Sequence, residues 1–167
     1  MGKRPKIKPK LNIIDKILEV AGFIILVSYW IFIISTYSNL PQKVPIHYGL
    51  NGKPDTTGSK ISFIILPILA TILFIGLTIL NNFPHIFNYL KKITEENALT
   101  QYTGATKLVR FIKTIILLMF GYISVQTYLI VTNRAVGLEA WFLPLSLALM
   151  FIPIIAYIYE QIKGKNK

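Results

Sequence analysis

The chain has 167 residues, of which 53% are hydrophobic and only 15% are charged, and its mean hydropathy is +0.56. This composition excludes an ordinary soluble domain. Lys and Arg outnumber Asp and Glu by 18 to 7. The basic residues gather beside the ends of apolar runs, which is typical of membrane-protein loops, so we expect no nucleic-acid partner. The sequence contains no cysteine, which excludes disulfides and thiol chemistry.

Four apolar runs predict four membrane-spanning helices, because a helix needs about 20 apolar residues to cross the hydrocarbon core. The fold class we expect is an all-α membrane protein with one four-helix transmembrane domain over residues 12–160. An outer loop at 39–60 joins helices one and two, an inner connection at 81–113 joins helices two and three, and basic cytoplasmic tails flank the domain at 1–11 and 161–167. The apolar runs themselves are residues 17–37, 61–80, 114–132 and 140–159.

The distribution of basic residues predicts that both termini lie in the cytoplasm. This orientation places fourteen Lys and Arg residues on the inner side and four on the outer side, as the positive-inside rule expects. We expect the tail at 1–11 to be disordered until it meets the anionic lipid of the inner leaflet. The sequence therefore predicts a multi-pass protein of the cytoplasmic (inner) membrane with membrane lipid as one partner.

The inner connection contains the signals of a helix start. Thr94 can cap a helix, and Glu95 and Glu96 follow where the helix dipole favours acids. Leu99 and Tyr102 then begin a run of apolar residues at roughly helical spacing. These features predict a short cytoplasmic amphipathic helix before the third membrane helix.

The outer loop is rich in residues that restrict the backbone. Two prolines favour extended geometry, residues 44–48 can form a short strand, and Asn51-Gly52 predicts a tight turn. Ser59 is placed to cap the second membrane helix. We therefore expect an ordered loop whose structural motif consists of Pro41, Pro45, Gly49, Gly52, Pro54 and Ser59.

The same loop carries the candidate residues for binding a ligand or partner. His47 is the one loop residue that titrates near neutral pH, and it fits either a binding contact or a structural hydrogen bond. Asp55 fits a turn-forming carboxylate or a functional one, and a His47–Asp55 pair is compatible with the turn. The full candidate set is His47, Tyr48, Asp55 and Lys60.

Motifs for catalysis or metal binding are not found in the sequence. It has no His-Glu-x-x-His, no Gly-x-Ser-x-Gly and no phosphate-binding glycine loop, so we expect no catalytic residue and no cofactor. We expect His47 and His85 on opposite sides of about 30 Å of hydrocarbon, where they cannot share a metal. Asp15, Glu19, Glu139 and Glu160 all lie near span ends, and no ionisable residue lies in the middle of a span, which disfavours a pump or a coupled transporter.

The outer loop resembles a family of bacterial membrane proteins. The run Leu40-Pro-x-x-Val-Pro-x-His-Tyr-Gly-x-x-Gly-x-Pro-Asp, followed by Gly58-Ser59-Lys60, is similar to the domain of unknown function 1648, which also occurs in SdpI-type immunity proteins. Residues 84–102 are similar to the stretch that follows helix two in many members. The sequence departs from the pattern at Thr57, where an aromatic or basic residue is usual.

The resemblance implies protection against a membrane-acting toxin, or sensing of it, through the outer loop. The immunity proteins are longer, with an extra membrane part at their carboxyl end. Three functions stay open: a non-enzymatic protein that binds a peptide, lipid or toxin, a membrane enzyme or transporter component that uses His47 and Asp55, and an assembly subunit that packs against membrane-protein partners.

Overall fold

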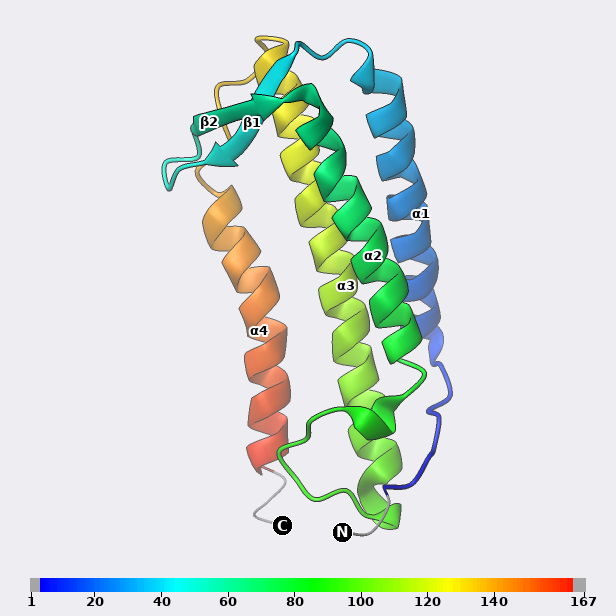
Figure 1. The fold of residues 1–167 in the computed structure, drawn as a ribbon. Coiled ribbons are helices and arrows are strands. Elements are labelled where there is room, and N and C mark those ends of the chain that lie inside the picture. Colours follow the sequence, from blue (N-terminus) through cyan, green and yellow to red (C-terminus); the bar gives the residue numbers. More distant parts are fainter. Residues whose placement is uncertain (1–3, 164–167) are drawn as a thin grey trace.

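A computed structural model describes residues 4–163, so the ends of both predicted tails, at 1–3 and 164–167, lie outside the described residues. Four long helices of the described chain run side by side (Figure 1). Each helix is long and apolar enough to cross a membrane, when α2 is counted with the 3-10 turn η1 before it. This confirms the prediction of four such helices. Their bounds are α1 Ile13–Tyr37, η1 Lys60–Ile64, α2 Ile65–Leu80, α3 Glu95–Val131 and α4 Phe142–Lys163.

Helix α1 begins with a capping box, in which Asn12 and Asp15 exchange side-chain to backbone hydrogen bonds of 2.9 and 3.0 Å. Its buried residues include Leu26, Tyr29 and Ile33, whose helical spacing places them on one face. The Tyr29 hydroxyl lies 2.6 Å from Ser124 on α3. The buried face of α1 therefore packs against α3.

Helices α1, α2 and α3 form the central unit of the bundle, while α4 packs mainly against α3. Trp30 of α1 donates a hydrogen bond of 2.9 Å to Thr71 of α2. The main core lies in the half of the bundle that carries the loop between α1 and α2, which we call the hairpin end (Figure 1). We call the opposite end, where the described chain begins and ends at residues 4 and 163, the tail end. The core consists of Leu26, Tyr29, Ile33, Leu40, Val44, Phe63, Ala70 and Leu117.

The prediction of a separate amphipathic helix before the third span is wrong. Residues 95–113 are the first half of α3, a single helix of 37 residues. A capping box of Thr94 and Asn97 starts this helix, and no proline follows to interrupt it before Val131. At 1.5 Å per residue α3 is about 55 Å long, so its first half extends beyond a hydrocarbon core of about 30 Å.

Residues 4–11 lie against the tail end of the bundle, so the prediction of a disordered tail is wrong for this part. The Arg4 guanidinium donates to the carbonyl oxygens of His85 and Phe87, at 3.1 and 2.6 Å. The Tyr102 hydroxyl donates to the Pro5 carbonyl at 3.0 Å. His85 lies in the short 3-10 turn η2, Pro84–Ile86, and Phe87 follows it. Arg4 thus supplies hydrogen-bond donors to carbonyl groups in a stretch that has no regular α-helix or sheet hydrogen bonds.

The loop between α1 and α2 folds into a two-stranded antiparallel sheet, which corrects the all-α prediction. Strand β1, Lys43–Tyr48, pairs with β2, Pro54–Ser59, and the register is irregular on both sides of His47. The hairpin lies across the hairpin end of the bundle, at a large angle to the helices (Figure 1). The prolines and the Asn51-Gly52 turn favour this extended structure.

Four charged side chains form an ion network between α1 and α3, on the tail side of the bundle. Arg110 bonds to Asp15 at 3.4 Å and to Glu19 at 3.1 Å, and Lys113 bonds to Glu19 at 2.6 Å. The Lys113 side chain is only 1% exposed and also donates to Thr78 at 2.8 Å. The charges of Arg110 and Lys113 are therefore balanced by acidic side chains inside the bundle. From the sequence we expected both residues to be unpaired in the inner connection.

Candidate functional site

The hairpin is tied to the bundle by Tyr48, at the end of β1. Its hydroxyl lies 2.6 Å from the Thr127 hydroxyl of α3. Thr127 already donates its one hydroxyl proton to the Ile123 carbonyl at 2.8 Å, so Tyr48 is the donor. Burial raises the pKa of Tyr48, which keeps the phenol protonated and able to donate.

A second tie joins the hairpin turn to the loop between α3 and α4. Gly52 has φ of +74°, and its carbonyl accepts a hydrogen bond of 2.7 Å from the Leu138 amide. A Cβ at Gly52 would collide with the Leu138 carbonyl oxygen, and one at Gly137 would collide with the Gly52 carbonyl oxygen. Glycine is thus required at both positions for the two loops to meet.

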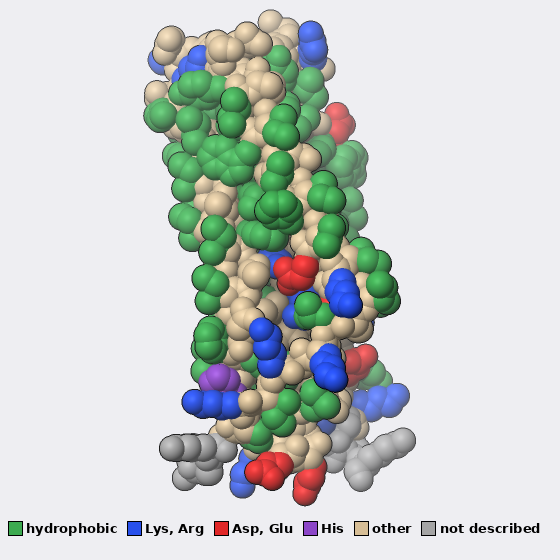
Figure 2. Space-filling view, turned by 90° about the vertical axis from the view of Figure 1, so that its right-hand side faces the viewer, with side chains coloured by type: hydrophobic (Ala, Val, Ile, Leu, Met, Phe, Trp, Pro, Cys, Tyr) green, Lys and Arg blue, Asp and Glu red, His purple; other side chains and the backbone are tan. Residues whose placement is uncertain are grey.

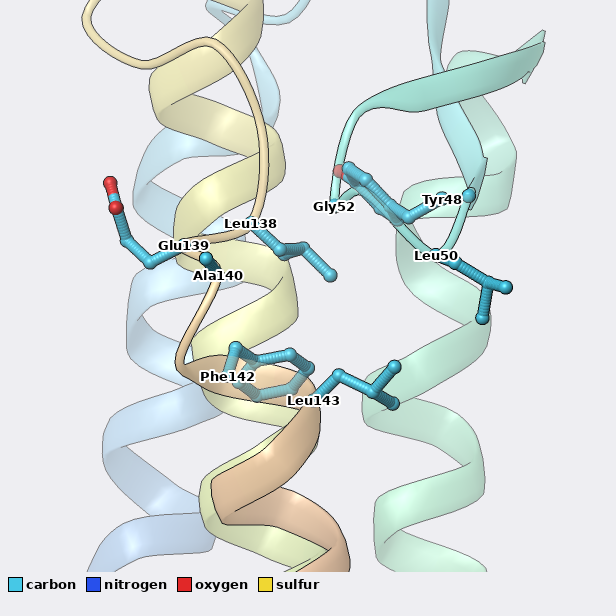
Figure 3. A pocket seen from close by; sticks show the side chains of 9 residues that line it. Tyr48, Leu50, Gly52, Leu138, Glu139, Ala140, Phe142 and Leu143 are labelled. Carbon is cyan, nitrogen blue, oxygen red and sulfur yellow. The ribbon is translucent and has the colours of Figure 1, made fainter.

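The turn and the start of α4 enclose a cavity of about 140 Å³, which we call the tip cavity. Figure 3 shows Tyr48, Phe142 and Leu143 around it, with Leu50 pointing along the bundle away from the α3–α4 loop. Leu50 is 94% exposed. An apolar side chain this exposed at the end of a membrane bundle fits contact with lipid or with an apolar partner.

The predicted site residue Lys60 lies away from this turn, at the end of α1. Its ammonium donates to the Ser38 carbonyl at 3.3 Å and lies 4.7 Å from the centre of the Tyr37 ring. These contacts fix the return of the chain from β2 into η1. Ser59 occupies the N-cap position of η1, but its side chain makes no capping hydrogen bond there. The expected cap is therefore wrong, and Lys60 supports the same turn instead.

His47 and Asp55 form a pair across the two strands. The His47 Nδ1 atom lies 2.6 Å from the Asp55 Oδ1 atom, and the two side chains are 67% and 47% exposed. The hydrogen bond from His47 lowers the pKa of Asp55, and the Thr56 hydroxyl also donates to this carboxylate at 3.1 Å. With Nδ1 held by a carboxylate, Nε2 of His47 is left to face a ligand.

A larger cavity of about 440 Å³, the outer cavity, lies beneath the hairpin between β1, α2 and α3. His47 lines it, the hydroxyls of Ser124 and Thr127 add polar groups, and most of the wall is apolar. A mainly apolar cavity with a few polar groups fits an acyl chain or an apolar peptide side chain. The other lining residues are Pro45, Ile46, Tyr48, Ser62, Phe63, Ile65, Leu66, Ile123 and Leu138.

The structure thus brings together two of the four predicted binding residues at one cavity, His47 and Tyr48. Asp55 holds His47 from the neighbouring strand, and Lys60 is placed elsewhere. Ser124 and Thr127, which lie far along the chain, were not among the predicted site residues. Their spacing of three on one face of α3 was the available signal, since neighbouring hydroxyls on a membrane helix need partners.

The two histidines lie at opposite ends of the bundle. His47 is in β1 at the hairpin end and His85 is in η2 at the tail end (Figure 1). Among residues 4–163, no group of three His, Cys, Asp or Glu side chains is placed to hold a metal ion. The chemistry of the outer site therefore depends on one imidazole, its carboxylate partner and the hydroxyls.

These features define a multi-pass integral membrane protein with an ordered hairpin at one end. Residues 23–71 match the family described as Domain of unknown function (DUF1648), which confirms the expected resemblance over this stretch. The match runs from α1 through the hairpin into α2. It ends before residue 84, so the resemblance over residues 84–102 stays a prediction.

An uncharacterized protein of Archaeoglobus fulgidus is 36% identical to the chain over 67 residues. This alignment covers 35% of the chain and 37% of the relative, so the chain spans well under half of that protein's length. No solved structure matches the chain.

Proposed function

We propose that this membrane protein is a non-enzymatic receptor for a membrane-active peptide, with an immunity or sensing role. The peptide would place an apolar side chain in the outer cavity and a polar group against His47. The observation that carries this proposal is a fixed, exposed His47–Asp55 pair at an apolar cavity of about 440 Å³ that is roofed by the hairpin.

Rigidity of the hairpin supports a binding role. Three ties hold it, at Tyr48, Gly52 and Lys60, and Val44 in β1 is fully buried. A preformed site loses less conformational entropy when a ligand binds. The exposed side chains of the pair make few contacts that the fold needs, so they are free to contact a partner.

We further propose that the hairpin end faces the outside of the cytoplasmic membrane. When Arg110 and Lys113 are set aside as buried partners of Asp15 and Glu19, the tail side still carries nine basic residues among residues 4–163, against four on the hairpin side. The positive-inside rule then favours the tail end in the cytoplasm, where the basic tails meet anionic lipid. The hairpin would meet a peptide that arrives from outside.

A protection assay tests the receptor role. Cells lacking the protein are challenged with a panel of membrane-active peptides after wild type or a variant is restored at matched membrane levels. Wild type should raise the inhibitory concentration of at least one peptide. His47→Ala, Asp55→Ala and the cavity-filling Leu66→Trp should each lower this protection about tenfold, the equivalent of about 1.4 kcal/mol of binding.

Two matched controls accompany these variants. Thr57→Ala changes an exposed residue of β2 whose side chain makes no hydrogen bond within residues 4–163, and Ile68→Trp adds the same bulk on an exposed face of α2. Both should protect like wild type. The proposal is contradicted if wild type protects the cells against none of the peptides. It is also contradicted if the controls and the site variants lose protection equally.

A second candidate function, a membrane enzyme, is supported by the geometry of the pair. A carboxylate on Nδ1 orients an imidazole so that Nε2 can accept a proton from a substrate or water. In that case Asp55→Asn, which keeps the shape of the side chain, would abolish turnover but leave peptide binding in place. Loss of binding in Asp55→Asn would favour the receptor role.

A further inference from the structure

A second cavity lies at the tail end, and its chemistry differs from that of the outer cavity. It has a volume of about 260 Å³ and lies between residues 8–11, α1, the end of α2 and α3. Its polar lining residues are Lys8, Glu19, Thr78, Asn81, Asn82, Thr106 and Arg110. We call it the inner cavity. Figure 2 shows the face over α1, where acidic and basic side chains gather in the lower half, while most of the upper half below its charged top is hydrophobic.

Asn81 supplies a hydrogen-bond acceptor that has no partner in the described chain. Its side-chain nitrogen donates to the Thr106 carbonyl at 3.2 Å, which orients the amide. Its Oδ1 atom is buried and receives no hydrogen bond from any group in residues 4–163, and the residue is only 6% exposed. A buried acceptor without a donor is destabilising, so a donor supplied by a ligand would stabilise this site.

The second acceptor at the cavity is the Glu19 carboxylate. It accepts hydrogen bonds from Arg110 and Lys113, yet its side chain is still 25% exposed. Each carboxylate oxygen can accept more than one hydrogen bond. Glu19 and Asn81 both line this cavity and both keep acceptor capacity, which suits a group with several N–H donors.

Positive charge also lines this cavity, next to the acceptors and at its edge. The exposed Lys8 lies at its edge and Arg110 lies in its wall. The buried part of the site is otherwise balanced, because Asp15 and Glu19 offset Arg110 and Lys113. A ligand that matches this arrangement has an ammonium for the acceptors and an anionic group for Lys8.

We propose that the inner cavity binds a phosphoethanolamine group, with its ammonium at Asn81 and Glu19 and its phosphate at Lys8. A primary ammonium has three N–H donors, whereas the trimethylammonium of a choline group has none. The site therefore discriminates between these two headgroups. Its level near the inner ends of α1 and α2 is where phospholipid headgroups lie, and a free phosphoethanolamine has the same chemistry.

Native mass spectrometry of the full chain tests this proposal. The protein is released from vesicles of phosphatidylglycerol mixed with either phosphatidylethanolamine or phosphatidylcholine of the same acyl chains. Wild type should retain the ethanolamine lipid at least about fivefold more than the choline lipid, which corresponds to one hydrogen bond of about 1 kcal/mol. Free phosphoethanolamine, added to protein in phosphatidylglycerol alone, tests the soluble source.

Two variants and one control locate the site. Asn81→Leu should remove the preference for ethanolamine over choline. Lys8→Gln, an exposed change that the fold tolerates, should weaken retention of both zwitterionic lipids. Gln101→Leu removes a buried amide whose Oε1 atom also has no partner in residues 4–163 but which does not line the cavity, and it should behave like wild type.

Equal retention of the two lipids by wild type, together with no effect of free phosphoethanolamine, would overturn the proposal. An ethanolamine preference that survives in Asn81→Leu would overturn it as well. Retention of free phosphoethanolamine by wild type, without a preference between the two lipids, would support the site and identify the soluble molecule as its ligand.

Discussion

Asp55 links the chemistry of the hairpin to pH. The His47 hydrogen bond lowers the pKa of Asp55 below its ordinary 3.8. Because this pKa is lower in the folded hairpin than in the unfolded chain, the pair stabilises the hairpin above the unfolded pKa. That stabilisation is lost as the pH falls through the folded pKa. The contribution of the Asp55 carboxylate to the stability of the hairpin is therefore present at neutral pH and is lost in acid.

Replacement of His47 should reverse this shift. In His47→Gln we expect the pKa of Asp55 to rise toward 3.8, measured by the ¹³C shift of its carboxyl during an NMR titration. Thr56→Ala removes a weaker hydrogen bond to the same carboxylate and should give a smaller rise. Identical Asp55 titrations in wild type and His47→Gln would show that the pair does not form.

At the scale of elements, Gly52 controls how the hairpin docks on the α3–α4 loop. Gly52→Ala should separate the two loops, because the new Cβ would collide with Leu138 and φ at this position is +74°. Hydrogen exchange should then accelerate at the Leu138 amide. Gly76→Ala is the matched control, since nothing in residues 4–163 lies within 4 Å of its added Cβ, and alanine favours the helix by about 1 kcal/mol.

The contact between α1 and α3 depends on the ion network. Lys113→Met should lower the free energy of unfolding by about 3 kcal/mol, because it leaves the Glu19 carboxylate with one partner fewer in the bundle. Adding Glu19→Gln to this variant should recover part of the loss. Both values can be measured by titration with a denaturing detergent.

Lys107→Met is the control for this series, because Lys107 is on the same helix but is in no ion pair among residues 4–163. It should change stability by less than about 0.5 kcal/mol. A similar loss in Lys107→Met and Lys113→Met would mean that the network contributes no more than any other basic residue of α3.

Much of this architecture could be predicted from local sequence signals. Hydropathy over about 20 residues defined the spans, and Asn51-Gly52 with its prolines indicated the hairpin. The ion network escaped prediction because Glu19 and Arg110 meet only after the chain has crossed the bundle twice. The one local signal was spacing. Two acids lie four residues apart on α1, Asp15 and Glu19, and two bases lie three residues apart on α3, Arg110 and Lys113, so each pair lies on one face of its helix.

The outer cavity escaped prediction for a similar reason. Its walls come from β1, α2 and α3, so no single segment contains the site. The helix start at Thr94 was predicted correctly, but the length of α3 was not. The polar residues before Arg110 are compatible both with a helix that lies on the membrane surface and with a membrane helix that extends beyond the bilayer, so the sequence did not distinguish the two.

For the whole molecule, the orientation in the membrane gives a direct prediction. The chain has no cysteine, so a single introduced cysteine reports on its own position. Thr57→Cys in the hairpin should react with a membrane-impermeant thiol reagent in intact cells. Glu96→Cys, at the start of α3, should react only after the membrane is opened. The reverse pattern would place the hairpin in the cytoplasm.

The ion network also sets the hydrophobic thickness that the protein presents to lipid. The rise from Glu19 to Tyr37 on α1 and from Lys113 to Val131 on α3 is about 27 Å in each case, at 1.5 Å per residue. An average hydrocarbon core is about 30 Å thick. Two helices tied at the same level cannot correct this mismatch by sliding past one another, so we expect the bilayer to thin around them and the protein to prefer lipids with shorter acyl chains.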